Sequence, residues 1–556
     1  MEAAHISSPL KHEKGGWTSF PFIIGAVMGL TLASGGWSAN LIVFLISEYN
    51  IKSIAATQIN NVILGCNNLF PIAGAIIADS FFGSFSVVAV FAFISLLGVI
   101  LLTLTSTIHS LRPPLCAVGS YACQTPSHLQ YGVLYRALSL ASLGVGGTRF
   151  TIATMGADQF DQPNHQAIFF NWYFLTLYLG SIISYTAIIY IQDNISWSLG
   201  FGICVIANAI SLAVFLLGKR FYRPSKPKGS PFMSIARVVV AAIRKRKMLS
   251  GNCQGLDYYH GDTSTKFQVR TPTENFRFLN FAAIRTEDEN QPSWKLCTLE
   301  ELEDLKILIK IMPLWSTSIF LSTTIAIFNS LTILQALTMD RHLGPHFKVP
   351  PGSFLVFNLV ATALSIFIID RFLLPAWKNL ICQTLTPLQR IGIGHVINIL
   401  AMVASALIES RRLHVVETHN SNGTPGSSIV PMSGLWLVLP LAIVGVGEGF
   451  HFPGQVALYY QEFPSSLRST STAMISLLIG IGFYLGTAIT NLVRRSTGWL
   501  PNNNINDGRL DNVFWLSAVI GVVNFGYYLV CAKLFKYQNV EKHDDHDHGE
   551  VSSIAH

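Results

Sequence analysis

The chain has 556 residues, of which 50% are hydrophobic and only 12% are charged, and its mean hydropathy is +0.44. These values exclude an ordinary soluble enzyme of this size and predict a protein that lies in a lipid bilayer. The net charge of +7 does not indicate nucleic-acid binding, because Lys and Arg lie mostly in loops between apolar runs, without a basic face interleaved with aromatics.

The N-terminal residues do not resemble a cleavable signal. Residues 1–19 begin MEAAHISSPLKHEKGG, which is polar, and the first apolar run is long enough to span a membrane and to remain in the mature protein.

Periodic apolar runs then predict an all-α membrane protein with twelve transmembrane helices. They lie near 20–47, 57–78, 85–107, 129–153, 170–191, 197–217, 305–336, 350–370, 387–409, 433–458, 470–492 and 511–535.

A polar segment divides these helices into two groups of six. Residues 218–304 hold the densest Lys and Arg in the chain, so the positive-inside rule places them in the cytoplasm, together with both termini. Loops 108–128 and 410–432 are then expected outside. The expected organisation is a cytoplasmic N-terminal segment at 1–19, six-helix bundles at 20–217 and 305–535, the linker at 218–304, and a solvated His/Asp-rich tail at 536–556.

The two halves repeat each other in sequence. GVGGTRF in the fourth predicted span resembles GVGEGF in the tenth, and ADSFFG (78–83) after the second has a counterpart in IDRFLLP (369–375) after the eighth. Both pairs align with a shift of six spans. Two pseudo-symmetric six-helix halves around a central site are the layout of the major facilitator fold.

Two charged residues stand inside the predicted spans. Arg149 lies in the fourth span, and Glu448 is the comparable carboxylate, in the tenth. A charge at bilayer depth costs about 2.5–3.5 kcal/mol on insertion scales, so such residues are expected to face a cavity or a partner. Arg149 is interpreted as the contact for an anionic substrate, and the alternative is that it only pairs with Glu448 as a gate between the halves.

Further polar residues in apolar spans are candidates for the lining of the cavity, although bridging helices is an equally common use of such groups. His451 follows Glu448 by three positions and is interpreted either as a pH-responsive neighbour or as a packing residue. The other candidates are Asn40, Tyr178, Asn329 and Gln335.

Several strings together resemble the plant nitrate/peptide transporter family, the proton-coupled oligopeptide transporter branch of the major facilitator superfamily. The resemblance covers nearly the whole chain, and GGWTSFPF, SIAATQI, LRPPLC and GTRFTIATMGADQ are most similar to the nitrate excretion transporter subgroup. The strings are IADSFFG (77–83), GGTRF and GADQF around the fourth span, FFNWYF (169–174), DNISWSLGFG (193–202), FRFLNFAAI (276–284), CTLEELEDLK (297–306), MPLWSTSIF (312–320), LTPLQRIGIG (385–394) and VGVGEG (444–449).

The resemblance implies a transporter rather than an enzyme, without a cofactor or a metal, that moves small inorganic anions out of the cell by alternating access, passively or with weak proton coupling. Nitrate is the expected anion, and chloride is the alternative. Members that are driven by protons carry an ExxER or ExxEK motif in the first helix. This chain has Val27, Leu30 and Thr31 at those places, so the helix offers no group that titrates. It also has Arg149 where the family usually has Lys, and Tyr178 where it has Asn.

The resemblance also implies structural roles at the ends of helices. Asp79 and Gly83 match the loop after the second helix, where an acid can meet a helix N-terminus and latch the cytoplasmic side. Asp158 is expected to act similarly, and Asp370 with Arg371 is the counterpart in the second half. Neither Asp79 nor Asp158 has a nucleophile or metal partner nearby in sequence, so catalysis is not expected.

Predicted exterior loops carry two further features. Cys116 and Cys123 lie close together on the oxidising face and are expected to form a disulfide. Asn422, in NGT, is the sequon with room to clear the membrane.

The expected location is the plasma membrane, with the vacuolar membrane as the alternative. For function, the alternatives are a proton-coupled or facilitated transporter of peptides or plant metabolites, and an anion sensor without net flux.

Overall fold

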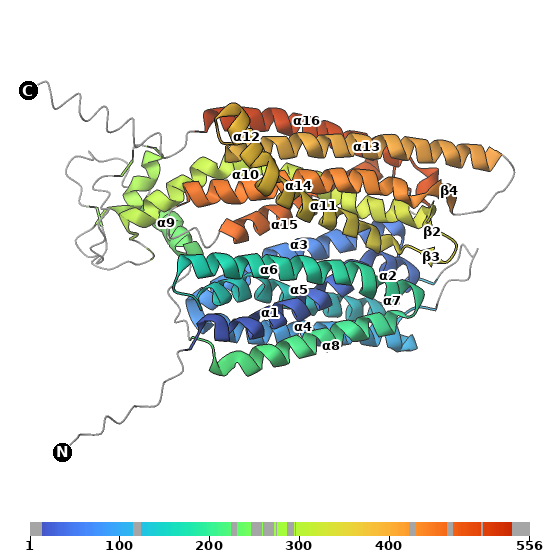
Figure 1. Cartoon of the computed structure of the whole chain (residues 1–556), viewed down its shortest axis with the longest axis horizontal. Coiled ribbons are helices and arrows are strands. Elements are labelled where there is room, and N and C mark those ends of the chain that lie inside the picture. The colour runs from blue at the N-terminus through green and yellow to red at the C-terminus, as the bar shows by residue number, and fades with distance from the viewer. Residues whose placement is uncertain are drawn as a thin grey trace, which may run out of the picture.

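The structure is a computed structural model, and it confirms an all-α membrane fold built from two helical bundles (Figure 1). All twelve predicted spans are helical. The residues that the structure describes are 14–114, 124–223, 231–245, 258–259, 272–273, 275–285, 294, 296–421, 429–463, 471–501 and 504–535.

The N-terminal half, blue to green in Figure 1, contains long helices that run side by side. Its first helix is extended by a short second one, and its fifth span continues through a π-helical segment into a short last helix. The helices are α1 (Phe20–Ser38), α2 (Leu41–Ser47), α3 (Ser53–Ile77), α4 (Ser84–Thr107), α5 (His128–Ala157), α6 (Pro163–Ile183), α7 (Ile189–Asn194) and α8 (Trp197–Leu217).

The C-terminal half, yellow to red, has the same organisation and lies against the first (Figure 1). Its first helix, α10, begins with a capping box in which Thr298 and Glu301 bond each other's backbone N–H groups. The helices are α10 (Leu299–Thr338), α11 (Leu355–Ile368), α12 (Leu374–Ile381), α13 (Pro387–Ser421), α14 (Val438–Glu462), α15 (Ser471–Ser496) and α16 (Leu510–Leu534).

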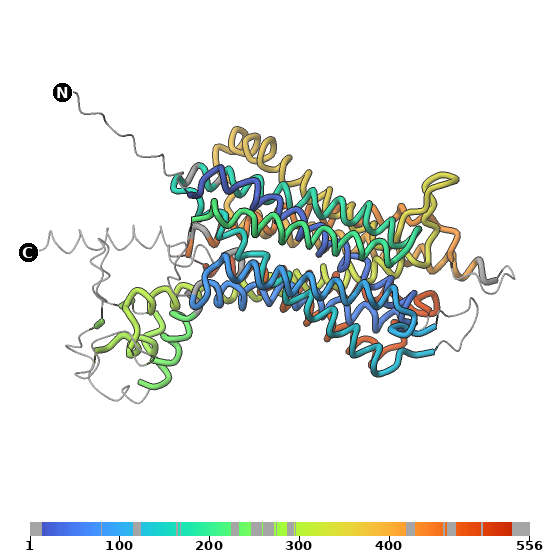
Figure 2. The backbone as a smooth tube through the Cα atoms, turned by 90° about the horizontal axis from the view of Figure 1, so that it is seen from below, coloured from blue at the N-terminus to red at the C-terminus, as the bar shows by residue number. Residues whose placement is uncertain are grey.

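The two ends of the bundle differ, and each is named here by a feature that lies on it. The linker end carries α9 (Pro231–Lys245), which lies beyond the ends of the long helices in both Figure 1 and Figure 2. The hairpin end carries short strands: β2 (His342–Leu343) pairs antiparallel with β3 (Phe347–Lys348), and β1 (Met339–Asp340) pairs parallel with β4 (Val430–Ser433).

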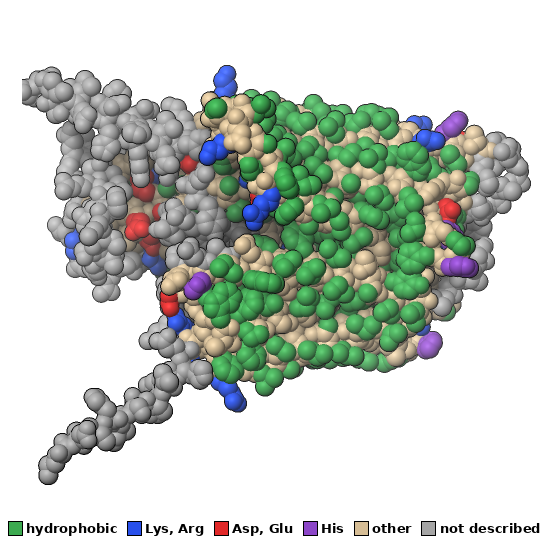
Figure 3. All heavy atoms as spheres, in the orientation of Figure 1, with side chains coloured by type: hydrophobic (Ala, Val, Ile, Leu, Met, Phe, Trp, Pro, Cys, Tyr) green, Lys and Arg blue, Asp and Glu red, His purple; other side chains and the backbone are tan. Residues whose placement is uncertain are grey.

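The surface of the bundle fits a membrane. Eleven helical segments of the described chain are long and apolar enough to cross one. The fourth predicted span, α5, is 30 residues long but is not among these segments, and it packs against α3 and α4 inside its half. On the face in Figure 3, apolar side chains cover the middle of the bundle and charged ones gather at its two ends.

The internal repeat is visible in the backbone. The segment after α3, η2 (Ala78–Phe82), and the segment after α11, η9 (Ile369–Leu373), are both π-helical turns. These are the segments that the ADSFFG and IDRFLLP strings occupy. Single π-helical turns are rare and often lie at functional positions. Their occurrence at equivalent places therefore supports the predicted repeat of the two halves.

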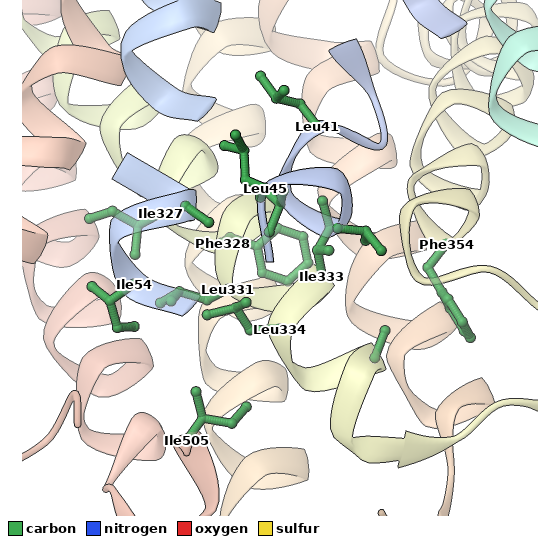
Figure 4. Packing of buried hydrophobic residues seen from close by; sticks show 14 of the residues in the cluster. Leu41, Leu45, Ile54, Ile327, Phe328, Leu331, Ile333, Leu334, Phe354 and Ile505 are labelled. Carbon is green, nitrogen blue, oxygen red and sulfur yellow. The ribbon is translucent and has the colours of Figure 1, made fainter. Parts of the chain in front are cut away.

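The apolar cores show how the halves are joined. At the hairpin end one cluster includes residues of both halves: Leu41, Leu45 and Ile54 lie near Leu331 and Leu334 of α10 (Figure 4). At the linker end each half has a cluster of its own. Burial of apolar surface is the main favourable term in packing. The halves therefore share one apolar core at the hairpin end and have separate cores at the linker end, where polar contacts such as the hydrogen bond from Ser476 to Asn68, at 3.3 Å, still join α15 to α3.

Polar and aromatic contacts add to the seal at the hairpin end. The Arg341 guanidinium lies 3.7 Å from the carboxylate of Asp193, across the boundary between the halves. Close by, the rings of Tyr190 and Phe347 stack with centroids 5.5 Å apart. Burial lowers the pKa of Arg341, and the nearby Asp193 partly offsets this effect. The hairpin of β2 and β3 thus fastens the second half to the first.

Glycines in α1 allow close helix packing. A Cβ atom added at Gly29 would lie 2.7 Å from the Ala207 carbonyl oxygen and 2.7 Å from Ser211 Cβ, both on α8. Backbone atoms of α8 cannot move away cheaply. Small residues at such crossings are a common basis of helix association in membranes.

We expect Gly29→Val to destabilise the purified protein by about 1–3 kcal/mol, the usual cost of overpacking a well-filled interior. The thermal unfolding midpoint in detergent measures this change. Gly526→Val is the matched control, because a Cβ atom at Gly526 would meet nothing within 4 Å. Equal midpoints for the two variants would contradict the close α1–α8 contact.

Candidate functional site

The site is built around Arg149, on the part of α5 that is nearer the linker end. The glycines before it are in close contact with other helices: a Cβ atom at Gly146 would collide with Phe70 of α3, and one at Gly147 with Phe91 of α4. Thr148 is buried and donates a hydrogen bond to the Gly144 carbonyl oxygen at 2.9 Å. This packing fixes α5, while the Arg149 side chain remains exposed.

The Arg149 guanidinium has no counter-charge in this conformation. Within the described residues, no carboxylate oxygen lies within 4.0 Å of it. The contact that is formed involves its backbone, because the Tyr173 hydroxyl donates to the Arg149 carbonyl oxygen at 2.8 Å. A guanidinium has five N–H donors in a planar fork, so the exposed group is available to an anion.

Three tyrosines of the fifth span, on α6 and on the π-helical segment η4 (Ser184–Ile188) that follows it, are influenced by the charge of Arg149. Tyr173 and Tyr185 are within electrostatic range of Arg149. Tyr178, which is half-buried, is within range of both Arg149 and Glu448. Three of the predicted site residues are therefore linked electrostatically, because the charges of both Arg149 and Glu448 act on Tyr178.

Glu448 is held by its own half of the protein. Its Oε2 atom accepts hydrogen bonds from Asn358 Nδ2 at 3.3 Å and from Thr362 Oγ1 at 3.2 Å, both on α11. The glycines on either side press α14 against α11, since a Cβ atom at Gly445 would lie 2.6 Å from the Asn358 carbonyl oxygen. Both hydrogen bonds come from neutral groups and are long, so they hold the carboxylate weakly.

The ion pair that the sequence suggested between Arg149 and Glu448 is absent from this conformation. Two physical reasons account for the difference. The neutral donors on α11 satisfy the Glu448 carboxylate within the second half. The two charges are also carried by different halves, on α5 and α14, whose apolar cores at the linker end are separate.

The sequence interpretation did not identify Asn358 and Thr362. A signal was present, because Asn358, Thr362 and Ser365 are polar residues at helical spacing in an otherwise apolar run. All three are buried, and Ser365 donates to the Gly445 carbonyl oxygen at 3.4 Å. Their common face is the one that packs against α14.

The first helix has no ionisable group at the positions of the proton-coupling motif. Val27 is buried in the apolar cluster of the first half, and Leu30 packs against the same cluster. Thr31 faces α6, where its Cγ2 atom would lie 3.0 Å from a Cβ atom added at Gly180. These residues therefore serve as packing residues in this structure.

Other predicted lining residues lie in different surroundings. Gln335 donates to the Glu409 carboxylate at 2.7 Å, in a buried group where Glu409 also pairs with Arg412 at 2.6 Å. Asn40 is buried where α2 begins, and a Cβ atom at Gly352 would lie 2.8 Å from its Oδ1 atom. Gln335 and Asn40 therefore help to join helices at the hairpin end.

Asn329 and His451 also lie among packed helices. Asn329 is half-buried, and its Oδ1 atom has no hydrogen-bond donor within the described residues. His451 is fully buried against the ring of His395, with centroids 5.2 Å apart. His395 belongs to α13, so His451 packs against α13, whereas Glu448 is hydrogen-bonded to α11.

The predicted gate residues lie at the linker end. Gly83 follows the π-helical turn with φ of 74°, a conformation that favours glycine. Asp158 is exposed at the end of α5, and the side chain of Asp79 lies outside the described part of the chain. Asp370 is 3.5 Å from Arg390, and Arg371 is exposed.

The residues of two predicted features fall outside the described part of the chain: Cys116 and Cys123 of the expected disulfide, and Asn422 of the sequon. The His/Asp-rich tail at 536–556 lies outside it as well. In the part of the chain that is described, no group of three or more His, Cys, Asp or Glu side chains is placed to hold a metal ion.

Comparison with curated proteins shows close relatives along the whole chain. The chain is 51% identical to Protein NRT1/ PTR FAMILY 2.7 of Arabidopsis thaliana, covering 100% of this chain and 98% of that protein. It is 50% identical to Protein NRT1/ PTR FAMILY 2.6 of the same plant, covering 100% and 98%.

Solved structures with the same fold are transporters. An auto-inhibited POT family peptide transporter matches with a TM-score of 0.69 at 18% identity, over 93% of this chain and 97% of that one. A POT family transporter in complex with 5-aminolevulinic acid matches with a TM-score of 0.65 at 13% identity, over 94% and 99%.

The sequence profile described as PTR2, POT family, matches residues 85–505. The match covers most of the chain, and the relatives above extend it to both ends. This agrees with the resemblance seen in the sequence motifs. The chain is therefore a membrane transporter, not an enzyme, and belongs to the POT family in its NRT1/PTR group.

Proposed function

We propose that this protein is a facilitative transporter of small inorganic anions, with nitrate as the main substrate. The observation that carries the proposal is the exposed Arg149 guanidinium, which stands between transmembrane helices without a carboxylate partner in the described chain. An uncompensated charge at this depth is costly, and a bound anion would supply the missing counter-charge.

The chemistry around Arg149 suits nitrate. The planar guanidinium fork matches planar oxygen acceptors with two parallel hydrogen bonds, a geometry that a spherical chloride ion does not use. The Tyr178 hydroxyl lies near the same charge and is a further donor. Nitrate is therefore favoured over chloride, which remains a second substrate of the same kind.

The first helix supports transport without an obligatory proton. A coupled carrier needs a carboxylate that loads and releases a proton as the protein changes conformation. Val27, Leu30 and Thr31 offer none, so the anion crosses with its own charge. One charge is worth about 2.3 kcal/mol per 100 mV, or about a fifty-fold concentration ratio. Net efflux follows from an inside-negative potential.

The separation of the halves supports alternating access. We infer that the linker end is cytoplasmic, because its charged residues follow the positive-inside rule, and that the plasma membrane is the location. Because the halves share an apolar core at the hairpin end and the Arg149 side chain is exposed, we expect an anion to reach Arg149 from the cytoplasm in this conformation. Release to the outside then requires separation of Arg341 from Asp193.

A second candidate is a small zwitterion, such as an amino acid derivative or a short peptide. Arg149 and Glu448 carry opposite charges on opposite halves, and a carboxylate and an amine on one molecule could bind both. The solved relative in complex with 5-aminolevulinic acid has the same fold. A flux panel in proteoliposomes decides between the candidates, and binding without flux would instead indicate a sensor.

We expect Arg149→Ala to raise the KM for nitrate by about 10- to 150-fold, because it removes a charged hydrogen-bond donor worth about 1.5–3 kcal/mol. Arg149→Lys should retain flux but favour chloride relative to nitrate, since the charge remains and the planar fork is lost. Tracer uptake into proteoliposomes measures both effects.

Arg136→Ala is the matched control for these variants, because Arg136 is also exposed on α5 but lies nearer the hairpin end. We expect it to transport nitrate as the unmodified protein does. A normal KM in Arg149→Ala would exclude Arg149 as the anion contact.

We also expect nitrate flux to carry current and to follow voltage rather than the proton gradient. At a potential clamped to zero, a proton gradient of either direction should not concentrate nitrate, because α1 lacks a proton carrier. Proteoliposomes with valinomycin and equal potassium on both sides provide this clamp. Accumulation that a protonophore abolishes would show that another residue couples protons to transport.

A further inference from the structure

The short helix α12 (Leu374–Ile381) differs from the long helices of the second half, because its side chains are not packed inside the protein. All eight of its residues lie in the described part of the chain, and none of them is buried. Leu380 is 83% exposed, and Trp377 and Ile381 are 37% and 43% exposed. Apolar side chains that share an uncovered face mark a surface that binds a partner.

The position of α12 indicates what that partner is. The helical segment Pro351–Ile381 has 31 residues, whereas about 20 are enough to cross the hydrocarbon core of a bilayer. Its last part, α12, therefore lies at the edge of that core. Figure 1 shows α12 running across the direction of the long helices, and Figure 2 shows it at the outer edge of the bundle near the linker end. A helix with this direction lies along the membrane surface.

The sequence of α12 is amphipathic. At helical spacing, Trp377, Leu380 and Ile381 share one face, and Lys378 and Asn379 lie on the other. An apolar face that includes Trp, opposite a polar face that includes Lys, is typical of helices that lie in the membrane interface. Trp side chains favour the headgroup level, where an apolar ring can sit next to water. The apolar face of α12 therefore suits lipid.

The charges around α12 favour lipid with an anionic headgroup. Arg371 precedes the helix and Lys378 lies within it, and both side chains are exposed. From Arg371 to Ile408 the chain contains no Asp or Glu, and Asp370, just before this stretch, lies 3.5 Å from Arg390. Within the described residues, neither Arg371 nor Lys378 has a carboxylate oxygen within 4.0 Å. Figure 3 shows basic side chains on this part of the surface.

A second copy of this chain is a less suitable partner for the same face. Stable protein interfaces bury about 800 Å² on each partner. A helix of eight residues is about 12 Å long, so one face of it is too small for such an interface. A lipid needs no more than a short apolar face and one or two cations.

We propose that α12 is an interfacial helix that binds anionic phospholipids of the cytoplasmic leaflet. Its apolar face enters the boundary between headgroups and acyl chains, and Arg371 and Lys378 bind phosphate oxygens. Anionic lipids give the cytoplasmic leaflet its negative surface potential, and the linker end faces that leaflet in the orientation inferred above. The inference is independent of which substrate is transported.

The experiment places a fluorescent reporter beside α12 in the full-length protein. Cys382 follows α12 directly and is exposed, so the environment-sensitive dye NBD can be attached to it after Cys116, Cys123 and Cys253 are replaced by Ser. A Cys382→Ser variant of that protein, treated with the same dye, gives the background. Protein in neutral detergent is titrated with phosphatidylglycerol, with phosphatidylcholine and with glycerol phosphate.

We expect phosphatidylglycerol to raise the NBD emission at lower concentrations than phosphatidylcholine does. Replacing both cations, by Arg371→Gln with Lys378→Gln, should weaken the apparent affinity for phosphatidylglycerol about thirtyfold, or about fivefold for each charge, and leave that for phosphatidylcholine unchanged. Leu380→Ser should weaken the binding of both lipids by a similar factor, because it removes apolar surface rather than charge. The changed side chains are exposed, so the variants are expected to fold.

Arg495→Gln is the matched control, because Arg495 is an exposed basic residue at the last turn of α15, at the hairpin end. It should leave both affinities unchanged. Equal affinities for the two lipids, or an unchanged affinity for phosphatidylglycerol in the double variant, would overturn the inference. A full response to glycerol phosphate would show a site for soluble phosphates and would also overturn it.

The test also covers the second copy as an occupant. A reporter that does not respond to lipid, in a protein that elutes as a dimer, would assign the face of α12 to a second chain and overturn the inference. Nitrate flux is not a readout in any of these measurements. A negative result therefore leaves the proposed function intact, and a loss of the proposed function leaves lipid binding by α12 intact.

Discussion

The arrangement of the site depends on one electrostatic constraint: a guanidinium inside a transmembrane bundle must find an anion or face water. The Arg149 side chain is exposed and has no carboxylate partner in the described chain. In this conformation the two halves share an apolar core at the hairpin end. If the linker end closed around it, the charge would need a partner. The need of Arg149 for a counter-charge therefore favours an anionic substrate. It also bears on how the two halves, joined at the hairpin end and with separate apolar cores at the linker end, are able to close.

The seal at the hairpin end and the openness at the linker end have different physical bases. The seal combines an apolar cluster from both halves with the Arg341–Asp193 pair and the Tyr190–Phe347 stack. Apolar contacts are non-directional and tolerate small shifts, whereas the ion pair and the stack specify one alignment. A gate of this kind resists leakage and still opens when a modest number of contacts is lost.

The sequence predicted the fold well, because the membrane leaves few alternatives. Backbone groups in lipid must be hydrogen-bonded internally, so long apolar runs become helices. The span that forms α5 and carries Arg149 was predicted from its apolar run at 129–153, although α5 is not among the segments apolar enough to cross a membrane by length and composition.

The contacts of the site were less predictable. Glu448 was identified as a lone intramembrane carboxylate, but its partners Asn358 and Thr362 lie about ninety residues away on another helix, and the hydrogen bonds themselves depend on how far α14 approaches α11. The expected pair with Arg149 failed to appear for a conformational reason. A sequence specifies which charges a carrier has, but one conformation shows only one of the pairings that its cycle uses.

The repeat explains why opposite charges face each other across the halves. On α5, Gly146 packs against α3 and Gly147 against α4; on α14, Gly445 packs against α11 and Gly447 against α13. The glycines thus set equivalent helices at equivalent depths in both halves. Once the backbone packing is fixed in this way, nearby residues are free to differ: Arg149 lies two positions after Gly147, and Glu448 lies directly after Gly447. The cation Arg149 on one half and the carboxylate Glu448 on the other therefore arise at related positions. Together they give one small site in which Arg149 can bind an anion or pair with Glu448.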